Sequence, residues 1–243
     1  ASEALQLVND APIYHWLSSG SDLVDLAITG KLPGGFPSGR YSHIFGLQAA
    51  GKTLIATEPL GAAQRAGGKA FFLDAEQTFD PARAARLHGL TYKPSNWLYG
   101  FPEGIEGLFD TCVSNAILEL KRSHGRKALE KRPPAAMVID SLSAICTAEE
   151  QKEALSKTGY GQSRAQKMSK AFRKYMYPTT GIPAVNLAVI FIDQVRDNIG
   201  NPFDPYTTSG GRALSFYSSV RLMLTERGKV RRKDPNGRDQ VIG

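Results

Sequence analysis

The sequence predicts an α/β fold with a mostly parallel, twisted sheet, helices on both faces and an antiparallel C-terminal extension. From Tyr41 onward, short apolar runs typical of buried strands alternate with longer segments of helical periodicity, and this alternation is typical of parallel sheets. A glycine-containing segment at residues 46–53 joins the first apolar run to a helical pattern. The 243 residues suffice for one domain with a sizeable core.

The chain before Tyr41 is predicted to form an arm and an entry into the core. Residues 1–19 carry apolar positions consistent with an N-terminal helix or arm that packs on another surface. Residues 20–243 are assigned to a single core. Within it, Gly20-Ser21-Asp22 precedes a predicted helix. Residues 30–39 contain two prolines and are predicted to form a loop.

The main part of the core is predicted to contain five strands and four helices. The strands lie at 41–45, 69–74, 97–100, 135–140 and 184–193, and the helices lie at about 52–66, 81–88, 104–122 and 162–177. Pro59 falls inside the first helix, where a proline typically costs ~3 kcal/mol, so we expect this helix to bend or end early. Runs at 219–225, 229–232 and 239–242, separated by turn residues, predict the antiparallel extension of the sheet.

Composition and charge narrow the class of protein. The apolar runs are far shorter than the roughly 18 to 20 residues of a membrane helix, and the N-terminus lacks a signal pattern. Cys112 and Cys146 match neither a disulfide framework nor a metal knuckle, so we expect a cytoplasmic protein with no membrane partner. The net charge of +7 favours a polyanionic partner if the charges cluster.

The segment at residues 46–53 fits the phosphate-loop pattern G-x-x-x-x-G-K-[ST]. Its residues are Gly46, Leu47, Gln48, Ala49, Ala50, Gly51, Lys52 and Thr53. Such a loop directs backbone N–H groups at phosphate oxygens, and the following helix N-terminus adds partial positive charge. Lys52 is expected to reach the β- and γ-phosphates, and Thr53 to offer its hydroxyl to Mg²⁺. A glycine-containing turn with a chance Lys-Thr pair is the alternative, but the flanking strand and helix favour a nucleotide site.

A nucleoside triphosphatase needs a second protein ligand for hydrated Mg²⁺, and Asp140 is the best candidate. It ends the apolar strand 135–140, at the sheet edge where α/β proteins bind ligands. Asp140 could instead cap the next helix. Because the phosphate loop makes a partner carboxylate expected, we predict that Thr53 and Asp140 hold the metal.

Two further strand ends carry candidate polar groups. Hydrolysis requires a group that orients or deprotonates water, and strand 69–74 leads directly into Asp74-Ala75-Glu76. We favour Glu76 for this role, with Asp74 as scaffolding, although an exposed loop glutamate is the alternative. After strand 184–193 stands Gln194, whose neutral amide could sense the γ-phosphate and relay its presence to the next loop.

Two segments are candidates for contact with nucleic acid. Residues 196–212 are rich in glycine and proline and are predicted to form a mobile loop. An inert connection is the alternative, but loops longer than ~12–15 residues are usually functional, so we favour a functional loop. Basic residues gather between 152 and 174, where a solvated helix face and a nucleic-acid track stay equally open. These are Lys152, Lys157, Arg164, Lys167, Lys170, Arg173 and Lys174, against the single acid Glu153.

Together these motifs resemble the RecA family of strand-exchange recombinases, in its bacterial and phage branch. The likeness runs from about Ser18 to the end and is far more specific than the phosphate loop alone. The segments that carry the likeness lie along the whole of this range. They are Ser19-Gly20-Ser21 with residues 34–40, residues 46–53, Asp74-Ala75-Glu76 with Asp80-Pro81, residues 138–141, residues 190–196, and residues 207–211 with Ala213-Leu214 and Phe216-Tyr217. The resemblance implies a RecA-like P-loop NTPase fold.

The resemblance also implies an ATPase core that forms a helical filament on DNA and binds ATP and Mg²⁺ between subunits. Lys52, Glu76 and Gln194 are then the catalytic set, with Gln194 as the γ-phosphate switch. Nucleotide binding extends from the phosphate loop to Leu54 and to Asp80 and Pro81, where the adenine packs. The implied DNA-binding residues are Arg164 and Arg173 for the first loop and its helix, and Arg196, Gly210, Gly211 and Arg212 for the second. Phe216 is implied at the subunit interface.

Three departures from the family pattern stand out. Leu54 replaces a second hydroxyl after Thr53, and Arg83 stands where an aromatic residue often stacks on adenine. Asp193 replaces the usual Asn beside the switch glutamine. Because a carboxylate near the γ-phosphate repels it unless paired, we expect Asp193 to turn away or to bind Arg196.

The first functional hypothesis is a DNA-dependent ATPase and recombinase. Its ATP-bound subunits form a filament on single-stranded DNA and promote homologous pairing and strand exchange with double-stranded DNA. The second hypothesis is a regulatory or mediator protein that uses ATP as a conformational ligand. The third is a hexameric helicase-type motor on the same fold.

Overall fold

We analysed a computed structural model of the chain. The structure describes residues 12–147, 150, 161–197, 206–208, 211–228, 231–233 and 239–241. The predicted helix or arm at residues 1–19 therefore lies partly outside the described residues, as do Lys152, Lys157 and Gly210.

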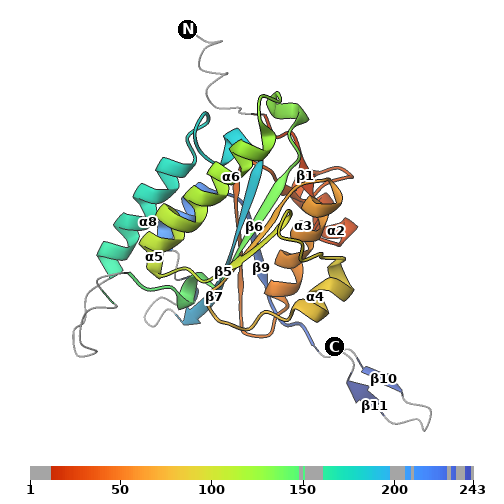
Figure 1. Ribbon diagram of the computed structural model, residues 1–243. Helices are drawn as coiled ribbons and strands as arrows, with labels where there is room; N and C mark the ends of the chain where they lie inside the picture. Colours follow the sequence, from red (N-terminus) through yellow and green to blue (C-terminus); the bar gives the residue numbers. More distant parts are fainter. Residues whose placement is uncertain are drawn as a thin grey trace.

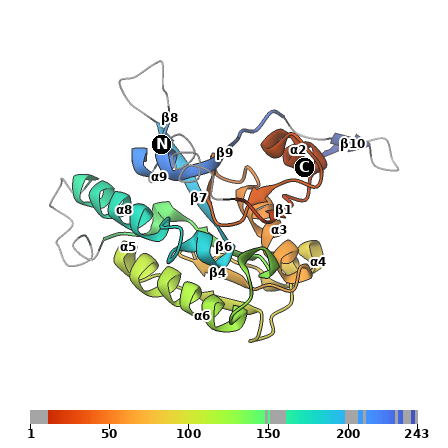
Figure 2. The same cartoon turned by 90° about the horizontal axis from the view of Figure 1, so that it is seen from above.

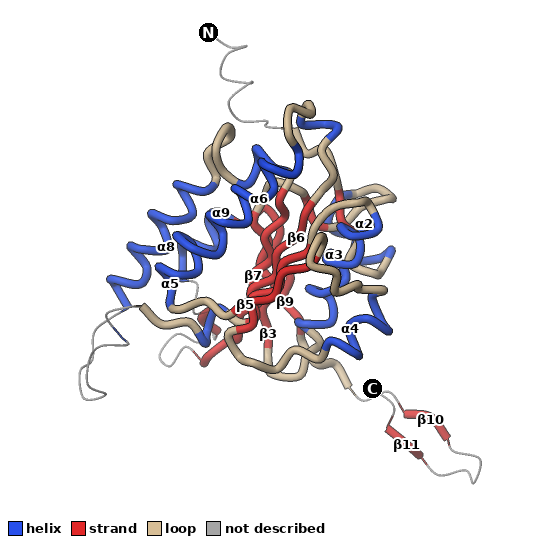
Figure 3. The backbone as a smooth tube through the Cα atoms, in the orientation of Figure 1, coloured by secondary structure: helices blue, strands red, loops and turns tan. Residues whose placement is uncertain are grey.

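A central sheet of parallel strands organises the described chain, and Figure 3 shows it as a red layer between blue helices. The strand order is β5-β4-β6-β7-β3-β9, and each of these neighbours pairs in parallel. The strands are β3 (Tyr41–Gly46), β4 (Ala70–Asp74), β5 (Trp97–Gly100), β6 (Ala135–Asp140), β7 (Leu187–Asp197) and β9 (Ser218–Leu224). Their carboxyl ends share one edge, where the sequence places the candidate site.

Helices cover both faces of the sheet, as predicted (Figure 2). On one side lie α2 (Asp22–Thr29), α3 (Lys52–Arg65) and α4 (Pro81–His88). On the other lie α5 (Gly104–Glu106), the π-helix η1 (Gly107–Val113), α6 (Ser114–His124) and α8 (Gly161–Tyr175), with α9 (Gly211–Tyr217) beside α8.

Alternating side chains of the strands feed a separate core on each face. Phe71, Met137 and Phe191 pack with η1, α6 and α8, whereas Phe72 and Val138 pack with α3 and α4 on the opposite face. This two-sided burial explains why the central strands read as continuous apolar runs.

The first predicted helix does not end early at its proline. Pro59 lies inside α3, which continues to Arg65. A proline removes one intrahelical hydrogen bond, but the same helix buries Ala56, Leu60 and Ala63 against the sheet. This packing keeps the helix intact.

Several predicted boundaries and one predicted strand direction are wrong. The strand expected from residue 184 begins at Leu187, because residues 182–185 form a 3₁₀-helix and Asn186 has a left-handed φ of 51°. Residues 218–224 extend the main sheet in parallel, since α9 returns the chain to the amino end of β3. Only β10 (Arg231–Lys233) and β11 (Asp239–Val241) form an antiparallel pair, in a separate small sheet.

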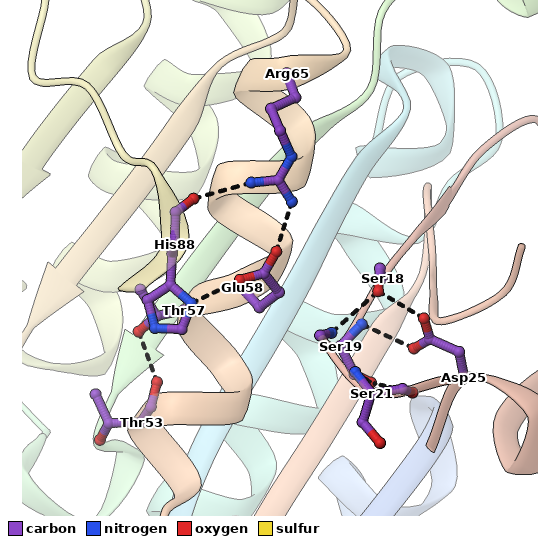
Figure 4. Close-up of polar contacts among 10 residues, drawn as sticks. Ser18, Ser19, Ser21, Asp25, Thr53, Thr57, Glu58, Arg65 and His88 are labelled. Carbon is purple, nitrogen blue, oxygen red and sulfur yellow. Dashed lines mark hydrogen bonds and ion pairs between the residues drawn. The ribbon is translucent and has the colours of Figure 1, made fainter. Parts of the chain in front are cut away.

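The entry into the core is an extended arm in the part that the structure describes. β1 (Trp16–Leu17) pairs antiparallel with β2 (Phe36–Pro37), inside the segment predicted as a loop. The buried Asp25 fixes the start of α2, because it accepts hydrogen bonds from Ser18 Oγ at 2.6 Å and from the Ser19 N–H at 2.8 Å (Figure 4).

Among the described residues, no helix has the length and apolar character needed to cross a membrane.

Replacement of Gly46 should destabilise the fold. A Cβ at this position would lie 2.2 Å from the Leu224 carbonyl oxygen, and the φ of +155° disfavours side chains. We expect Gly46→Ala to lower the free energy of unfolding by about 1–3 kcal/mol, measured by urea denaturation. Gly107→Ala is the control, because its Cβ meets nothing closer than 3.4 Å. Equal stability of the two variants would contradict this expectation.

Candidate active site

The phosphate loop turns between β3 and α3 through residues with positive φ. Ala49 has a φ of 60° and Gly51 a φ of 87°, and α3 begins at Lys52. The amino group of Lys52 donates to the carbonyl oxygens of Gly46 at 3.0 Å and Leu47 at 2.6 Å. The side chain of Lys52 is therefore folded back under the loop, and burial lowers its pKa against the opposing influence of Asp140.

Thr53 and Asp140 meet across the site as the sequence predicted. The Thr53 hydroxyl donates to Oδ2 of Asp140 at 2.7 Å. Burial raises the pKa of Asp140 to about 6, opposed by this hydrogen bond, while Glu76 and Asp74 add to the increase. The two oxygen donors fit a hard cation, which would relieve the accumulated negative charge.

Residues in or directly after three neighbouring strands meet at one oxygen atom. Oε1 of Glu76, after β4, accepts a hydrogen bond from Gln194 Nε2 at 3.0 Å. The same oxygen accepts a short hydrogen bond from the hydroxyl of Ser141, which follows β6. No role was assigned to Ser141 from the sequence. Its position directly after the candidate metal ligand Asp140 was the one signal that could have pointed to it.

Two other carboxylates near the site serve the scaffold. Asp74 is fully buried and accepts hydrogen bonds from Tyr99 Oη at 2.8 Å and from two backbone N–H groups. Asp193 is also fully buried, and its Oδ2 lies 3.8 Å from Nε2 of the buried His43. Asp193 therefore turns into the protein, which was the first of the two arrangements expected from the sequence. Its Oδ1 accepts a hydrogen bond from the backbone N–H of Gln194.

A cavity of about 440 Å³ connects the phosphate loop with α4. Its polar wall contains Glu76, Asp140 and Gln194, and its opposite wall contains Asp80 and Arg83. The remaining lining residues are Gln48, Ala49, Ala50, Gly51, Lys52, Thr53, Leu54, Thr57, Thr78, Phe79, Ala84, Leu87, His88 and Ile192. The cavity joins a polar end suited to phosphates to a partly apolar end suited to a base.

Three predicted nucleotide-binding residues do not line this cavity. Pro81 starts α4, while its neighbour Asp80 caps the helix by accepting from the Arg83 N–H at 2.9 Å. The contact of Pro81 with a nucleotide therefore stays a prediction, with Pro81 next to the lining residue Asp80. Gly46 and Leu47 also lie outside the lining and touch the site through the carbonyl groups that hold Lys52.

An ion-pair network that sequence reasoning missed ties α4 to α3 beside the cavity (Figure 4). The carboxylate of Glu58 contacts Nδ1 of His88 at 2.7 Å and Nη2 of Arg65 at 2.5 Å. Arg65 also donates to the His88 carbonyl oxygen at 2.9 Å. Glu58, Arg65 and His88 therefore fix the distance between the two helices that flank the cavity.

Two of the predicted DNA-binding residues, Arg164 and Arg173, lie on α8. Arg164 donates to the carbonyl oxygens of Ile145 and Leu142, both at 2.7 Å, so it holds α8 to the segment after β6. Arg173 is exposed on α8 beside Lys170 and Lys174.

The second predicted loop starts later than expected. Arg196 lies in β7, where it pairs with Thr207 of β8 (Tyr206–Thr208), so its assignment to a loop is wrong. Gly211 and Arg212 form the first turn of α9. The side chains of Arg196 and Arg212, and the whole of Gly210, lie outside the described residues.

The fold and this site define a P-loop nucleotide-binding protein of the α/β class. The family model for the RecA N-terminal domain matches residues 6–98 and 129–242, so the chain belongs to the RecA family. It is 34% identical over 231 residues to Protein RecA of Caulobacter sp. (strain K31), 35% to Protein RecA of Azospirillum lipoferum and 33% to that of Chlorobaculum parvum. Each match covers 93% of this chain and 56–60% of the relative.

Removal of the Asp140 charge should stabilise the protein without nucleotide or Mg²⁺. Since the pKa is about 6 in the fold and 3.8 ordinarily, ionised Asp140 destabilises the fold fully above pH 6 and not below pH 3.8. We expect Asp140→Asn to raise the free energy of unfolding at pH 8 by up to about 3 kcal/mol, with the gain shrinking toward pH 4. Urea denaturation at both pH values measures this, and a gain independent of pH would contradict it.

Proposed function

We propose that this chain is the ATPase core of a recombinase that assembles on single-stranded DNA and pairs it with homologous double-stranded DNA. The observation that carries the proposal is the hydrogen bond from Gln194 to Oε1 of Glu76. It connects a carboxylate in the nucleotide cavity with a residue of β7. Relatives named Protein RecA support it. The cysteines, which are free, and the matching family further support a cytoplasmic protein.

The triphosphate of ATP fits the polar end of the cavity. The Lys52 amino group bonds to the carbonyl oxygens of Gly46 and Leu47, which are part of the phosphate loop. When ATP binds in this loop, the amino group would exchange these carbonyl oxygens for phosphate oxygens. Thr53 and Asp140 would hold Mg²⁺, which supplies neutralisation of the phosphate charge when bound. Asp80 and Arg83 stand where the base would lie.

Glu76 is the candidate that orients and deprotonates the attacking water. Its carboxylate lines the cavity, and the hydrogen bonds from Ser141 and Gln194 hold one oxygen in place. The fixed orientation matters because a general base must lie within hydrogen-bond reach of the proton that it accepts.

Gln194 is the candidate sensor of the γ-phosphate. If its amide leaves Glu76 to bind phosphate, the change passes directly into β7, which pairs with β8 beyond it. The predicted second DNA-binding loop, residues 196–212, begins at the end of β7 and includes β8. A ligand that binds one of two arrangements more tightly shifts the population toward it.

The proposed assembly and DNA surface involve two exposed features. Phe216 on α9 is 80% exposed, which suits a contact with a second copy of the chain. Arg173 and Lys170 on α8 offer exposed positive charge to the DNA backbone. Each added subunit would repeat both features along the strand.

Binding and hydrolysis of ATP should separate in two variants. We expect Lys52→Ala to lose ATP binding and filament assembly, because Lys52 is the one lysine among the described residues that line the cavity. Glu76→Gln should bind ATP and DNA but hydrolyse ATP at least about 100-fold more slowly, as removal of a general base typically costs. Fluorescent ATP binding and phosphate release measure the two steps.

Exposed residues away from the cavity supply matched controls. Lys93→Ala and Glu226→Gln remove the same groups at exposed positions and should behave as wild type. Hydrolysis by Glu76→Gln at the wild-type rate would contradict the role proposed for Glu76.

DNA should stimulate the ATPase through Gln194. We expect single-stranded DNA to raise the wild-type hydrolysis rate, with a DNA affinity that falls steeply with salt because phosphate contacts release counterions. Gln194→Ala should bind ATP yet respond little to DNA, since the link from cavity to β7 is lost. A wild-type protein that neither binds single-stranded DNA nor responds to it would contradict the recombinase proposal.

Electron microscopy with ATP and single-stranded DNA tests the assembly. We expect filaments, whereas closed rings would indicate a hexameric motor.

A further inference from the structure

A second cluster of positive charge lies at the end of α6 and in the segment that leads from α6 to β6. We call it the α6–β6 basic surface and define it by five exposed residues. They are Lys121, Arg122, Arg126, Lys127 and Lys131. Four of the five fall within residues 99–128, which the RecA family model does not match.

This surface lies at the opposite end of the sheet from the nucleotide cavity. α6 ends at His124 and β6 begins at Ala135, so the basic segment precedes the amino end of β6. The phosphate loop follows the carboxyl end of the parallel strand β3. In Figure 1 the segment after α6 lies at the top, whereas α3 begins near the bottom. A ligand on the basic surface therefore does not occupy the ATP site.

Nearby acids offset the charge of this surface only in part. None of its five cations forms a side-chain ion pair within the described part of the chain, although Lys121 donates to the Thr180 carbonyl oxygen at 3.3 Å and the exposed Glu130 lies within the segment. The neighbouring acid Glu119 is bound to Lys69 at 2.8 Å, and its pKa is lowered first by Lys69 and to a smaller extent by Arg122. Burial, with a smaller contribution from the nearby cations Arg132, Lys127 and Lys69, lowers the pKa of His124 to about 4. The cations around His124 thus act in the same direction as its burial.

Backbone contacts hold the basic segment in a fixed shape. Arg132 donates to the Lys127 carbonyl oxygen at 2.8 Å and to that of Ala184 at 2.5 Å. Nδ2 of Asn186 donates to the Leu129 carbonyl oxygen at 2.8 Å. A preorganised cationic surface loses less conformational entropy on binding than a flexible basic tail.

The composition of the segment distinguishes between anionic partners. Residues 119–134 contain no phenylalanine, tyrosine or tryptophan, and the ring of His124 is buried. This disfavours an unpaired strand, because its bases need exposed stacking partners. None of the five positions is apolar, and Leu118 is the one large apolar residue of α6 that is exposed. A membrane surface would require an apolar face as well. Duplex DNA, which presents paired rows of phosphate, fits best.

We propose that the α6–β6 basic surface binds the phosphate backbone of duplex DNA, independently of base sequence and of ATP. Lysine and arginine side chains that neutralise phosphates release condensed counterions, which supplies sequence-independent affinity. The proposal does not depend on the recombinase function, because it concerns a different end of the molecule and requires no nucleotide.

The test measures the affinity of the nucleotide-free chain for a duplex by fluorescence anisotropy between about 50 and about 200 mM salt. The variant is Arg122→Gln/Arg126→Gln/Lys127→Gln. The control, Arg86→Gln/Lys93→Gln/Arg227→Gln, removes the same charge at other exposed positions. We expect the slope of log affinity against log salt to become shallower by about 2.7 in the variant, since each phosphate contact contributes about 0.9. The control should retain the wild-type slope.

Three results would overturn the proposal. They are no duplex binding by the wild type without nucleotide, an equal change in both triple variants, and loss of binding to anionic lipid vesicles but not to DNA. Lys121→Gln/Lys131→Gln provides a second variant if the first unfolds, as monitored by circular dichroism. Repeating the assay in Lys52→Ala separates this surface from the proposed ATP-dependent binding, since duplex binding should persist there even if ATP-dependent binding of single-stranded DNA is absent.

Discussion

The site depends on one carboxylate oxygen. Oε1 of Glu76 accepts hydrogen bonds from Ser141 and Gln194, so residues that follow β4 and β6 and a residue of β7 meet at one atom. This is possible because the three strands are parallel neighbours, with Asp74 paired to Asp140 in register. A slip of one residue would turn each of these side chains to the other face. The buried apolar faces that fix the register therefore also fix the chemistry.

Much of this arrangement was predictable because it follows from local pattern. Each strand is an apolar run, and each candidate polar residue comes directly after one, so Glu76, Asp140 and Gln194 were expected to share an edge. The phosphate loop could be recognised from the spacing of its glycine, lysine and threonine residues alone. The contact between Thr53 and Asp140 follows from the same topology, although 87 residues separate them in the chain.

The features that sequence missed depend on contacts between distant segments. The direction of residues 218–224 is set by where α9 delivers the chain, which no periodicity reveals. Pro59 is tolerated because a buried helix face outweighs one lost hydrogen bond. Glu58, Arg65 and His88 meet only once α3 and α4 are packed together. In each case a long-range contact overrides a local preference.

The two ends of the parallel sheet also differ in the charges that they carry. In a parallel sheet the carboxyl ends of the strands concentrate acidic and amide groups around the nucleotide cavity, where Lys52 is partly neutralised by Asp140 and by carbonyl oxygens. The segment before the amino end of β6 instead carries exposed cations that form no side-chain ion pair in the described chain. A net charge of +7 is thus unevenly distributed. Because exposed charges more than about 10 Å apart are largely screened at 0.1 M salt, positive charge at the amino end can act on a polyanion independently of the cavity.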